Sequence, residues 1–171
     1  LFDWQKPDAV FGLHVFSTVT AGHIGYRAGP AMAASDRFDI LVTGRQTHGS
    51  RPWGGIDPMV PAAQIVLCLQ TIPSRQVDIA RLPAVISVGS IHGGIRNNII
   101  PDDVRLVGTI RTFDDAVRDD IHARVERTAT SLASASGATP FARASSHTSV
   151  ARHGTTASST ASSMVVSDQP R

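Results

Sequence analysis

The sequence predicts an α+β fold in which two helices cover one face of an antiparallel β-sheet. Segments with apolar residues at every second position, the pattern of half-buried strands, occur at three places between residues 37 and 137. Two longer segments suited to helices lie among them. The resulting order of strand, helix, strand, strand, helix gives an antiparallel sheet with both helices on one side.

The first expected strand covers residues 38–44 and places three apolar side chains on one face, those of Phe38, Ile40 and Val42. The first helix is expected to begin at Asp57 and Pro58, because aspartate caps free backbone amides and proline suits the first turn. It is expected to end near residue 72. Since this segment is apolar nearly all round, we expect the helix to be well buried.

The second and third expected strands cover residues 84–89 and 104–111. The third alternates between an apolar face, with Leu106 and Ile110, and a polar face that ends in Arg111. A second helix follows, with acidic residues at its start and a glycine at its end, as helix termini favour. The helix is expected to begin at Asp114 and Asp115 and to end at Gly137. Its apolar stripe consists of Val117, Ile121, Val125, Ala129 and Leu132.

Three parts of the chain differ in character, and we expect three structural regions. Residues 1–36 are strand-like and rich in glycine, residues 37–137 form the βαββα unit, and residues 138–171 are rich in Ser, Thr, Ala and Arg. A ferredoxin-like βαββα(β) unit needs a fourth strand beginning near Ala138. We do not expect this strand, because residues 139–163 lack an alternating apolar pattern. Two interpretations of the last region stay open, a frameshifted end and a disordered low-complexity tail.

Composition excludes several classes of protein. The 171 residues carry a formal net charge of +2, too small for a nucleic-acid or membrane footprint. No apolar run is long enough to cross a bilayer. The single cysteine excludes an internal disulfide and agrees with a reducing compartment. We therefore expect a cytoplasmic protein without nucleic-acid or membrane partners.

Five motifs follow one another between residues 10 and 137. They are FGLHV at 11–15, GRQTHGSRPW at 44–53, GIDP at 55–58, GGIRNNIIPD at 93–102 and GTIRTF at 108–113. In this order they resemble the M20 metallopeptidases, and within them the amidohydrolase branch of hippurate hydrolases and N-acyl-amino-acid amidohydrolases. Any one motif is weak, whereas five in the right order are a strong indication.

The resemblance implies an α/β catalytic domain that holds two divalent metals and a smaller inserted lid domain that makes a homodimer. Residues 1–36 would be a remnant of the metal-binding catalytic domain, and residues 37–137 the dimerisation domain. The substrate would be an N-acyl amino acid or a small peptide, whose amide bond is hydrolysed by metal-activated water. Zinc is the expected metal, with manganese, cobalt and nickel as alternatives.

The chain is expected to be a fragment of such an enzyme and to be inactive alone. In the family, a Glu–Glu pair and further metal ligands lie outside the segment that resembles this chain, whose only glutamate is Glu126. A catalytic zinc needs about three protein ligands. We therefore do not expect this chain alone to bind metal tightly. The alternative function is a non-catalytic dimerisation module.

Two histidines match functional positions of the family. His14 matches a metal ligand just before the lid, and a neutral imidazole is a favoured ligand for zinc; a structural histidine is the alternative. His48 matches the histidine that is thought to reach across the dimer and stabilise the tetrahedral oxyanion. A solvent-exposed loop histidine is the alternative there.

Two further residues match substrate-binding positions. Asn98 matches the asparagine before Ile-Ile-Pro that donates from its amide to the substrate, and its alternative is a turn residue. Arg111 is expected on the sheet face opposite the helices. There its planar guanidinium could pair with the substrate carboxylate; an ordinary surface arginine is the alternative.

Overall fold

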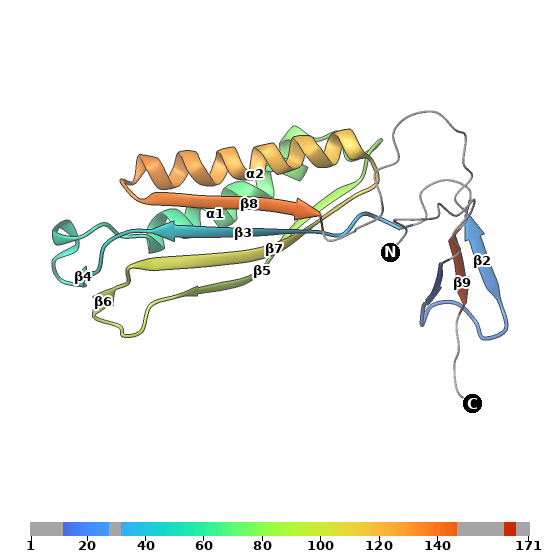
Figure 1. The fold of residues 1–171 in the computed structure, drawn as a ribbon, viewed down its shortest axis with the longest axis horizontal. Coiled ribbons are helices and arrows are strands. Elements are labelled where there is room, and N and C mark those ends of the chain that lie inside the picture. The colour runs from blue at the N-terminus through green and yellow to red at the C-terminus, as the bar shows by residue number, and fades with distance from the viewer. Residues whose placement is uncertain (1–11, 28–31, 147–162, 167–171) are drawn as a thin grey trace, which may run out of the picture. The chain divides into compact units, whose positions relative to one another are not determined.

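The structure is a computed structural model that describes residues 12–27, 32–146 and 163–166 (Figure 1). The chain divides into two compact units, one of residues 1–33 and 151–171 and the other of residues 34–150. Each unit is described by itself.

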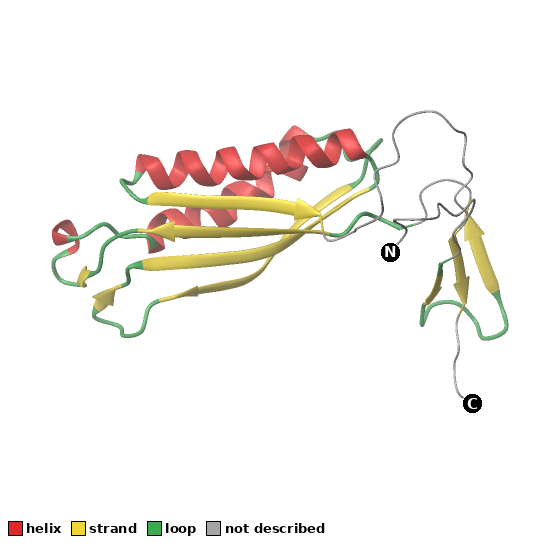
Figure 2. Cartoon of the chain, in the orientation of Figure 1, coloured by secondary structure: helices red, strands yellow, loops and turns green. Residues whose placement is uncertain are grey.

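The larger unit is a four-stranded antiparallel sheet with two helices on one face (Figure 2). The strands run in the order β5-β7-β3-β8, which is the order of a ferredoxin-like βαββαβ unit. The predicted fold is thus confirmed. Its main elements are β3 (Asp36–Thr43), α1 (Met59–Thr71), β5 (Ala84–Gly93), β7 (Asp103–Thr112), α2 (Asp115–Ala135) and β8 (Thr139–Ser146).

Strand β8 corrects the expectation that the sequence lacks a fourth strand. It pairs with β3 along all eight of its residues. The side chains that β8 turns toward the helices are small, because Ala142 and Ala144 are the partly buried residues packed against the core. Small side chains under a helix leave no alternation of large apolar residues, so the pattern search missed the strand.

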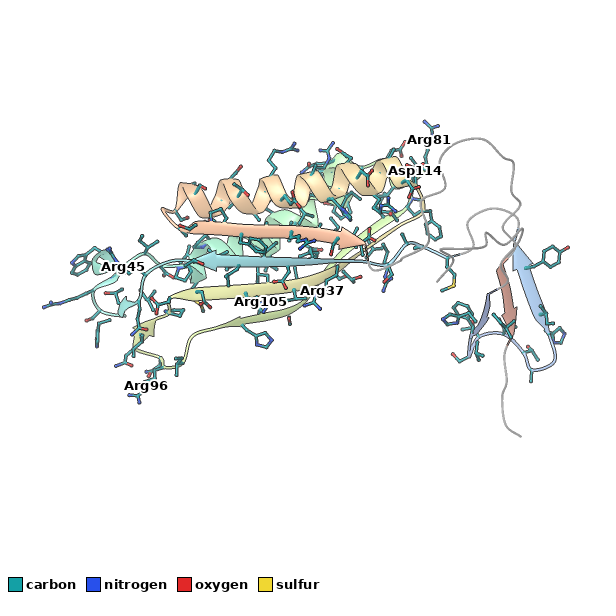
Figure 3. The ribbon with its side chains drawn as sticks, in the orientation of Figure 1. Arg37, Arg45, Arg81, Arg96, Arg105 and Asp114 are labelled. Atoms are coloured by element: carbon teal, nitrogen blue, oxygen red, sulfur yellow. The ribbon has the colours of Figure 1, made fainter. Side chains whose placement is uncertain are left out.

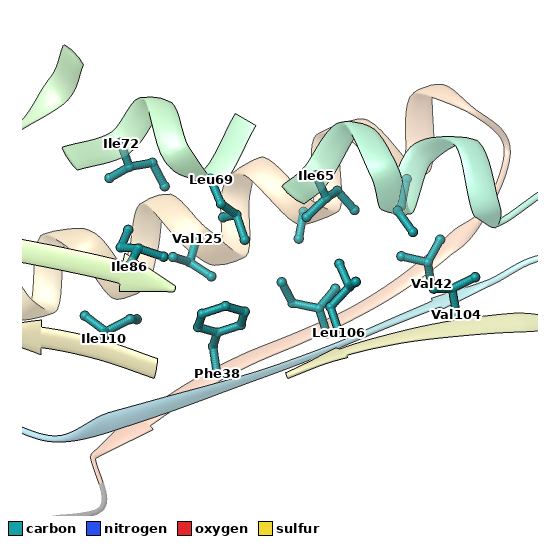
Figure 4. Close-up of a cluster of buried hydrophobic side chains, with 14 of the residues drawn as sticks. Phe38, Val42, Ile65, Leu69, Ile72, Ile86, Val104, Leu106, Ile110 and Val125 are labelled. Carbon is teal, nitrogen blue, oxygen red and sulfur yellow. The ribbon is translucent and has the colours of Figure 1, made fainter. Parts of the chain in front are cut away.

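The core lies between the sheet and the two helices (Figure 4). Phe38 and Leu106 from the sheet meet Ile65 and Leu69 of α1 and Val125 of α2, and all five are completely buried. The alternate positions of β3 and β7 carry exposed or half-buried residues. The two-residue alternation in the sequence therefore identified the helix-covered face correctly.

Helix α1 is less buried than the sequence predicted. Its core-facing side is fully covered, but Leu67 is 71% exposed and Val60 is 56% exposed. The helix is apolar on two sides, and the sheet of this unit covers only one of them. The second apolar side of α1 is therefore exposed on the surface of this unit. An exposed apolar patch of this kind often marks an interaction site. A π-helical turn, Ile72–Gln76, follows α1.

Helix α2 ends as the sequence predicted at both termini. The Asp114 carboxylate accepts a hydrogen bond from the Val117 amide at 2.9 Å. Gly137 takes a φ of 75°, the left-handed conformation that closes many helices.

The smaller unit contains a three-stranded sheet of β1 (Leu13–Val15), β9 (Ser163–Val166) and β2 (Ile24–Arg27). β9 pairs parallel to β1 and antiparallel to β2. The strand-like character expected of the first region is seen at β1 and β2. The expectations for residues 147–162 and 167–171 concern residues outside those described. Among the helices described, none has the length and apolar character needed to cross a membrane.

Candidate functional site

Two short strands at one end of the larger sheet bring two predicted site residues together (Figure 1). β4 (Thr47–His48) pairs antiparallel with β6 (Ile99–Ile100), so His48 lies opposite Ile99. One residue further along, the Gly49 amide donates to the Asn98 carbonyl at 2.7 Å. We call residues 44–58 and 94–100 the tip. The structure therefore places His48 and Asn98 side by side on the tip, and both are exposed.

Glycines make this close approach possible. A Cβ on Gly49 would lie only 3.2 Å from the Asn98 carbonyl oxygen. A Cβ on Gly55 would lie 2.8 Å from the Thr47 side chain, which is too close without a shift. The Thr47 hydroxyl in turn donates to the Arg51 carbonyl at 3.0 Å. The glycine-rich sequence of the motif is thus required by the packing of the tip.

The ring of His48 is held by its own turn. The Ser50 amide donates to Nδ1 of His48 at 3.1 Å, and the Ser50 hydroxyl oxygen lies 2.8 Å from the same nitrogen. The Arg51 amide closes the turn by donating to the His48 carbonyl at 2.8 Å. The sequence analysis named His48 as a candidate site residue but did not identify Ser50 as its hydrogen-bond partner.

Arg111 does not join His48 and Asn98. It lies near the far end of β7, opposite Val85, whereas the tip adjoins the Asp103 end of the same strand. Eight residues separate positions 103 and 111 (111 − 103 = 8), which is roughly 26 Å at about 3.3 Å per residue. Arg111 is exposed, and its alternation with buried Ile110 places it on the sheet face away from the helices, as expected. One small molecule cannot contact both Arg111 and the tip of one chain.

His14 lies on β1 of the smaller unit and is exposed. Its Nδ1 lies 2.8 Å from the Val15 carbonyl oxygen. A carbonyl only accepts, so Nδ1 is the donor in this contact, and a neutral ring would then keep its lone pair on Nε2. This is the arrangement of most metal-bound histidines. No cluster of three or more His, Cys, Asp or Glu side chains forms among the residues described, and the metal-ligand role of His14 stays a prediction.

A basic groove that the sequence did not predict crosses the open face of the sheet. Arg37 and Arg105, labelled in Figure 3, both pair there with Asp39. Arg143 and Phe141 of β8 complete a hollow of about 590 Å³. Nε of Arg105 donates to Asp39 at 2.8 Å. This hydrogen bond, opposed in part by burial, holds the pKa of Asp39 below its usual value of 3.8. The sequence did contain a signal for this groove, because charged residues alternate with the buried apolar residues of β3 and β7.

A buried carboxylate lies at the start of β3. Asp36 is 2% exposed and accepts a hydrogen bond from Nε2 of His122 on α2 at 2.9 Å. The guanidinium of Arg118 lies 3.9 Å from the same oxygen. Helix α2 is thereby fixed to the end of the sheet where the chain enters the unit. This cluster is part of the framework, well removed along β3 from the tip.

The sequence was compared with models of known protein families. The model of the peptidase dimerisation domain of the M20 family matches residues 22–136, which is more than half of the chain. The chain belongs to the M20 family. The match runs from β2 to the end of α2, so it covers the larger unit up to that point. Strand β8 follows the matched residues and completes the sheet of this M20 dimerisation domain.

Individual M20 relatives support the assignment. N-acetyl-L-cysteine deacetylase of Bacillus subtilis is 44% identical over 117 residues, which are 68% of this chain and 28% of that protein. N-acyl-L-amino acid amidohydrolase of Geobacillus stearothermophilus is 40% identical over 131 residues, or 77% of this chain and 35% of that protein. The solved structure of the YXEP protein of Bacillus subtilis, a dinuclear metal binding peptidase of the M20 family, has a TM-score of 0.60 and 31% identity. It covers 80% of this chain and 32% of that one. This M20 chain thus spans about a third of the length of these relatives.

Proposed function

We propose that this chain supplies the dimerisation lid and one metal ligand of an amidohydrolase that cleaves the amide bond of N-acyl amino acids or small peptides. Relatives named as an N-acetyl-L-cysteine deacetylase and an N-acyl-L-amino acid amidohydrolase support this reaction class. The proposed enzyme is cytoplasmic, and hippurate-like N-acyl amino acids are its proposed substrates. Since the chain spans about a third of these relatives, we propose that it does not hydrolyse amides by itself.

The observation that carries the proposal is the separation of Arg111 from the tip. His48 and Asn98 share one end of the unit, and Arg111 lies roughly 26 Å away along β7 at about 3.3 Å per residue. If all three groups contact one small substrate, they come from two protomers. A homodimer in which the tip of one protomer enters the active site of its partner meets this requirement.

A second exposed feature supports the homodimer. β5 is an edge strand of the sheet, so one side of its backbone is available for pairing. Beside it, α1 and β5 form an apolar groove of about 540 Å³, lined among others by Val66, Leu67 and Ile91. We propose that two copies pair through this edge and through α1. This accounts for the second apolar side of α1.

Each predicted site residue has a proposed role in this arrangement. The partner's tip offers the His48 ring N–H and the Asn98 amide to the carbonyl oxygen, where charge develops in the transition state. Arg111 pairs with the carboxylate of the substrate through its planar fork. His14 holds a divalent metal, with zinc proposed first, which activates water when bound.

Mixed dimers of the proposed whole enzyme, with this chain as its lid, test the proposal. His48→Ala and His14→Ala are each expected to lower kcat on an N-acetyl amino acid, the first by about 10²–10³-fold as for an oxyanion donor. Exchanging subunits between the two variants is expected to restore activity. In the mixed dimer, one site combines an intact His14 with the partner's intact His48.

Two results would contradict the proposal. If mixing restores nothing while each variant still dimerises, His48 acts within its own protomer. If His48→Ala leaves kcat unchanged, the tip has no catalytic role. Asp78→Asn, an exposed loop carboxylate, is the control and is expected to leave kcat unchanged.

A further inference from the structure

The turn from His48 to Arg51 brings the Ser50 backbone amide against the ring of His48. A backbone N–H can only donate a hydrogen bond. Because the Ser50 amide points at Nδ1 of His48 at 3.1 Å, that nitrogen must offer its lone pair. The Ser50 hydroxyl, 2.8 Å from the same atom, can turn its proton toward the same lone pair and share it with the amide.

We propose that Ser50 is a positioning residue that locks neutral His48 in its Nε2–H tautomer and aims that N–H away from the turn. This inference rests on the proposed role of His48 as a donor to the oxyanion. A ring free to exchange tautomers would present a bare Nε2 for part of the time, and a lone pair facing a developing negative charge would be repulsive. The turn removes that state before substrate binds.

The same chain offers a contrast at His14. There Nδ1 faces the Val15 carbonyl and must donate, so Nε2 is left bare. A metal ligand needs a bare nitrogen, whereas an oxyanion donor needs a protonated one. The local hydrogen bonds of His14 and His48 therefore select opposite tautomers, each matched to its proposed role.

The backbone of the tip makes this local control durable. The Gly49 amide is tied to Asn98 at 2.7 Å, and the Arg51 amide is tied to the His48 carbonyl at 2.8 Å. The residues on both sides of the ring are thus fixed by hydrogen bonds that do not involve the ring. The direction of the Ser50 amide is therefore set by the backbone of the turn.

The test is ¹⁵N NMR of the 171-residue chain at a pH well above the ordinary histidine pKa. Long-range ¹H–¹⁵N spectra are expected to show His48 with an unprotonated Nδ1 and a protonated Nε2, without averaging between tautomers. A scalar coupling across the hydrogen bond is expected between the Ser50 amide nitrogen and Nδ1 of His48. His92, an exposed histidine of β5, provides the reference spectrum of a solvent-facing ring.

A Ser50→Ala variant separates the two contacts. It removes the hydroxyl but keeps the amide, so the coupling is expected to persist while the Nδ1 resonance of His48 moves. Ser50→Thr restores a hydroxyl and is expected to return the resonance toward the wild-type position. The variants change an exposed loop side chain and leave the core intact.

The proposal is overturned if the coupling is absent and the His48 nitrogens show the same tautomer averaging as His92. A Nδ1 resonance that does not move in Ser50→Ala would remove the hydroxyl from the positioning role. None of these readouts depends on catalysis. Failure of the tautomer lock is therefore distinguishable from failure of the proposed function, which the mixed-dimer activity tests.

Discussion

At the scale of single residues, the buried carboxylate of Asp36 is predicted to contribute strongly to stability. It accepts from His122 and lies beside Arg118, and both partners are only 17% exposed. Asp36→Asn is expected to lower the free energy of unfolding by about 3 kcal/mol, the lower end of the cost of removing one partner of a buried pair. Urea unfolding followed by circular dichroism measures it.

Asp115→Asn is the matched control, because the Asp115 side chain also contacts Arg118 but is 86% exposed. Its expected cost is below about 1 kcal/mol, as for surface ion pairs. Equal effects of the two substitutions would show that the burial of Asp36 contributes nothing.

The Asp39–Arg105 pair predicts a pH dependence of stability. Arg105 lowers the pKa of Asp39 in the folded chain, so the unfolded state binds the proton more readily. The stabilisation is therefore present above the unfolded pKa and is lost as the pH falls through the folded pKa. Asp39→Asn is expected to cost less than about 1 kcal/mol at neutral pH, since the pair is partly exposed.

Unfolding curves of wild type and Asp39→Asn between neutral and acidic pH check this prediction. The difference between them is expected to shrink as the pH falls below the ordinary aspartate value of 3.8. Asp78→Asn, at an exposed loop position, serves as the reference. A difference that grows on acidification would contradict the direction of the pKa shift.

At the scale of elements, Gly108 on β7 leaves no room for a side chain between itself and Phe38. A Cβ there would lie 2.1 Å from Cζ of Phe38 and 2.3 Å from the Ser87 carbonyl oxygen. Gly108→Ala is therefore expected to destabilise the fold by about 3 kcal/mol, at the upper end of overpacking costs. Gly89→Ala on neighbouring β5 is the control, because its Cβ would meet only the Val107 oxygen at 3.8 Å. Thermal unfolding of both variants tests this, and equal melting temperatures would contradict it.

The elements also show why sequence reasoning succeeded in part. Strands β3 and β7 were predicted because large apolar residues alternate along them, and α2 because its cap and its stripe agree. β8 was missed because its covered positions are alanines. The tip could not be assembled from local pattern at all. His48 and Asn98 are fifty residues apart (98 − 48 = 50), and only the β4–β6 pairing brings them together.

At the scale of the whole molecule, α1 and the neighbouring edge strand β5 expose apolar side chains that no described residue of the larger unit covers. Leu67 is 71% exposed at its centre, and Ile91 is 51% exposed on the neighbouring strand. Such a patch next to an available strand edge suits a second copy of the same chain, because a two-fold axis satisfies both edges at once. The proposed catalytic role of the tip depends on this pairing.

Sedimentation velocity of the 171-residue chain tests the pairing most directly, with Leu67→Arg as the variant and Phe141→Arg as the control. Phe141 is 57% exposed but lies on β8, at the opposite edge of the sheet. We expect a dimer for the wild type and for Phe141→Arg, and a folded monomer for Leu67→Arg. A wild-type monomer, or a Leu67→Arg variant that remains dimeric, would contradict pairing through α1 and β5.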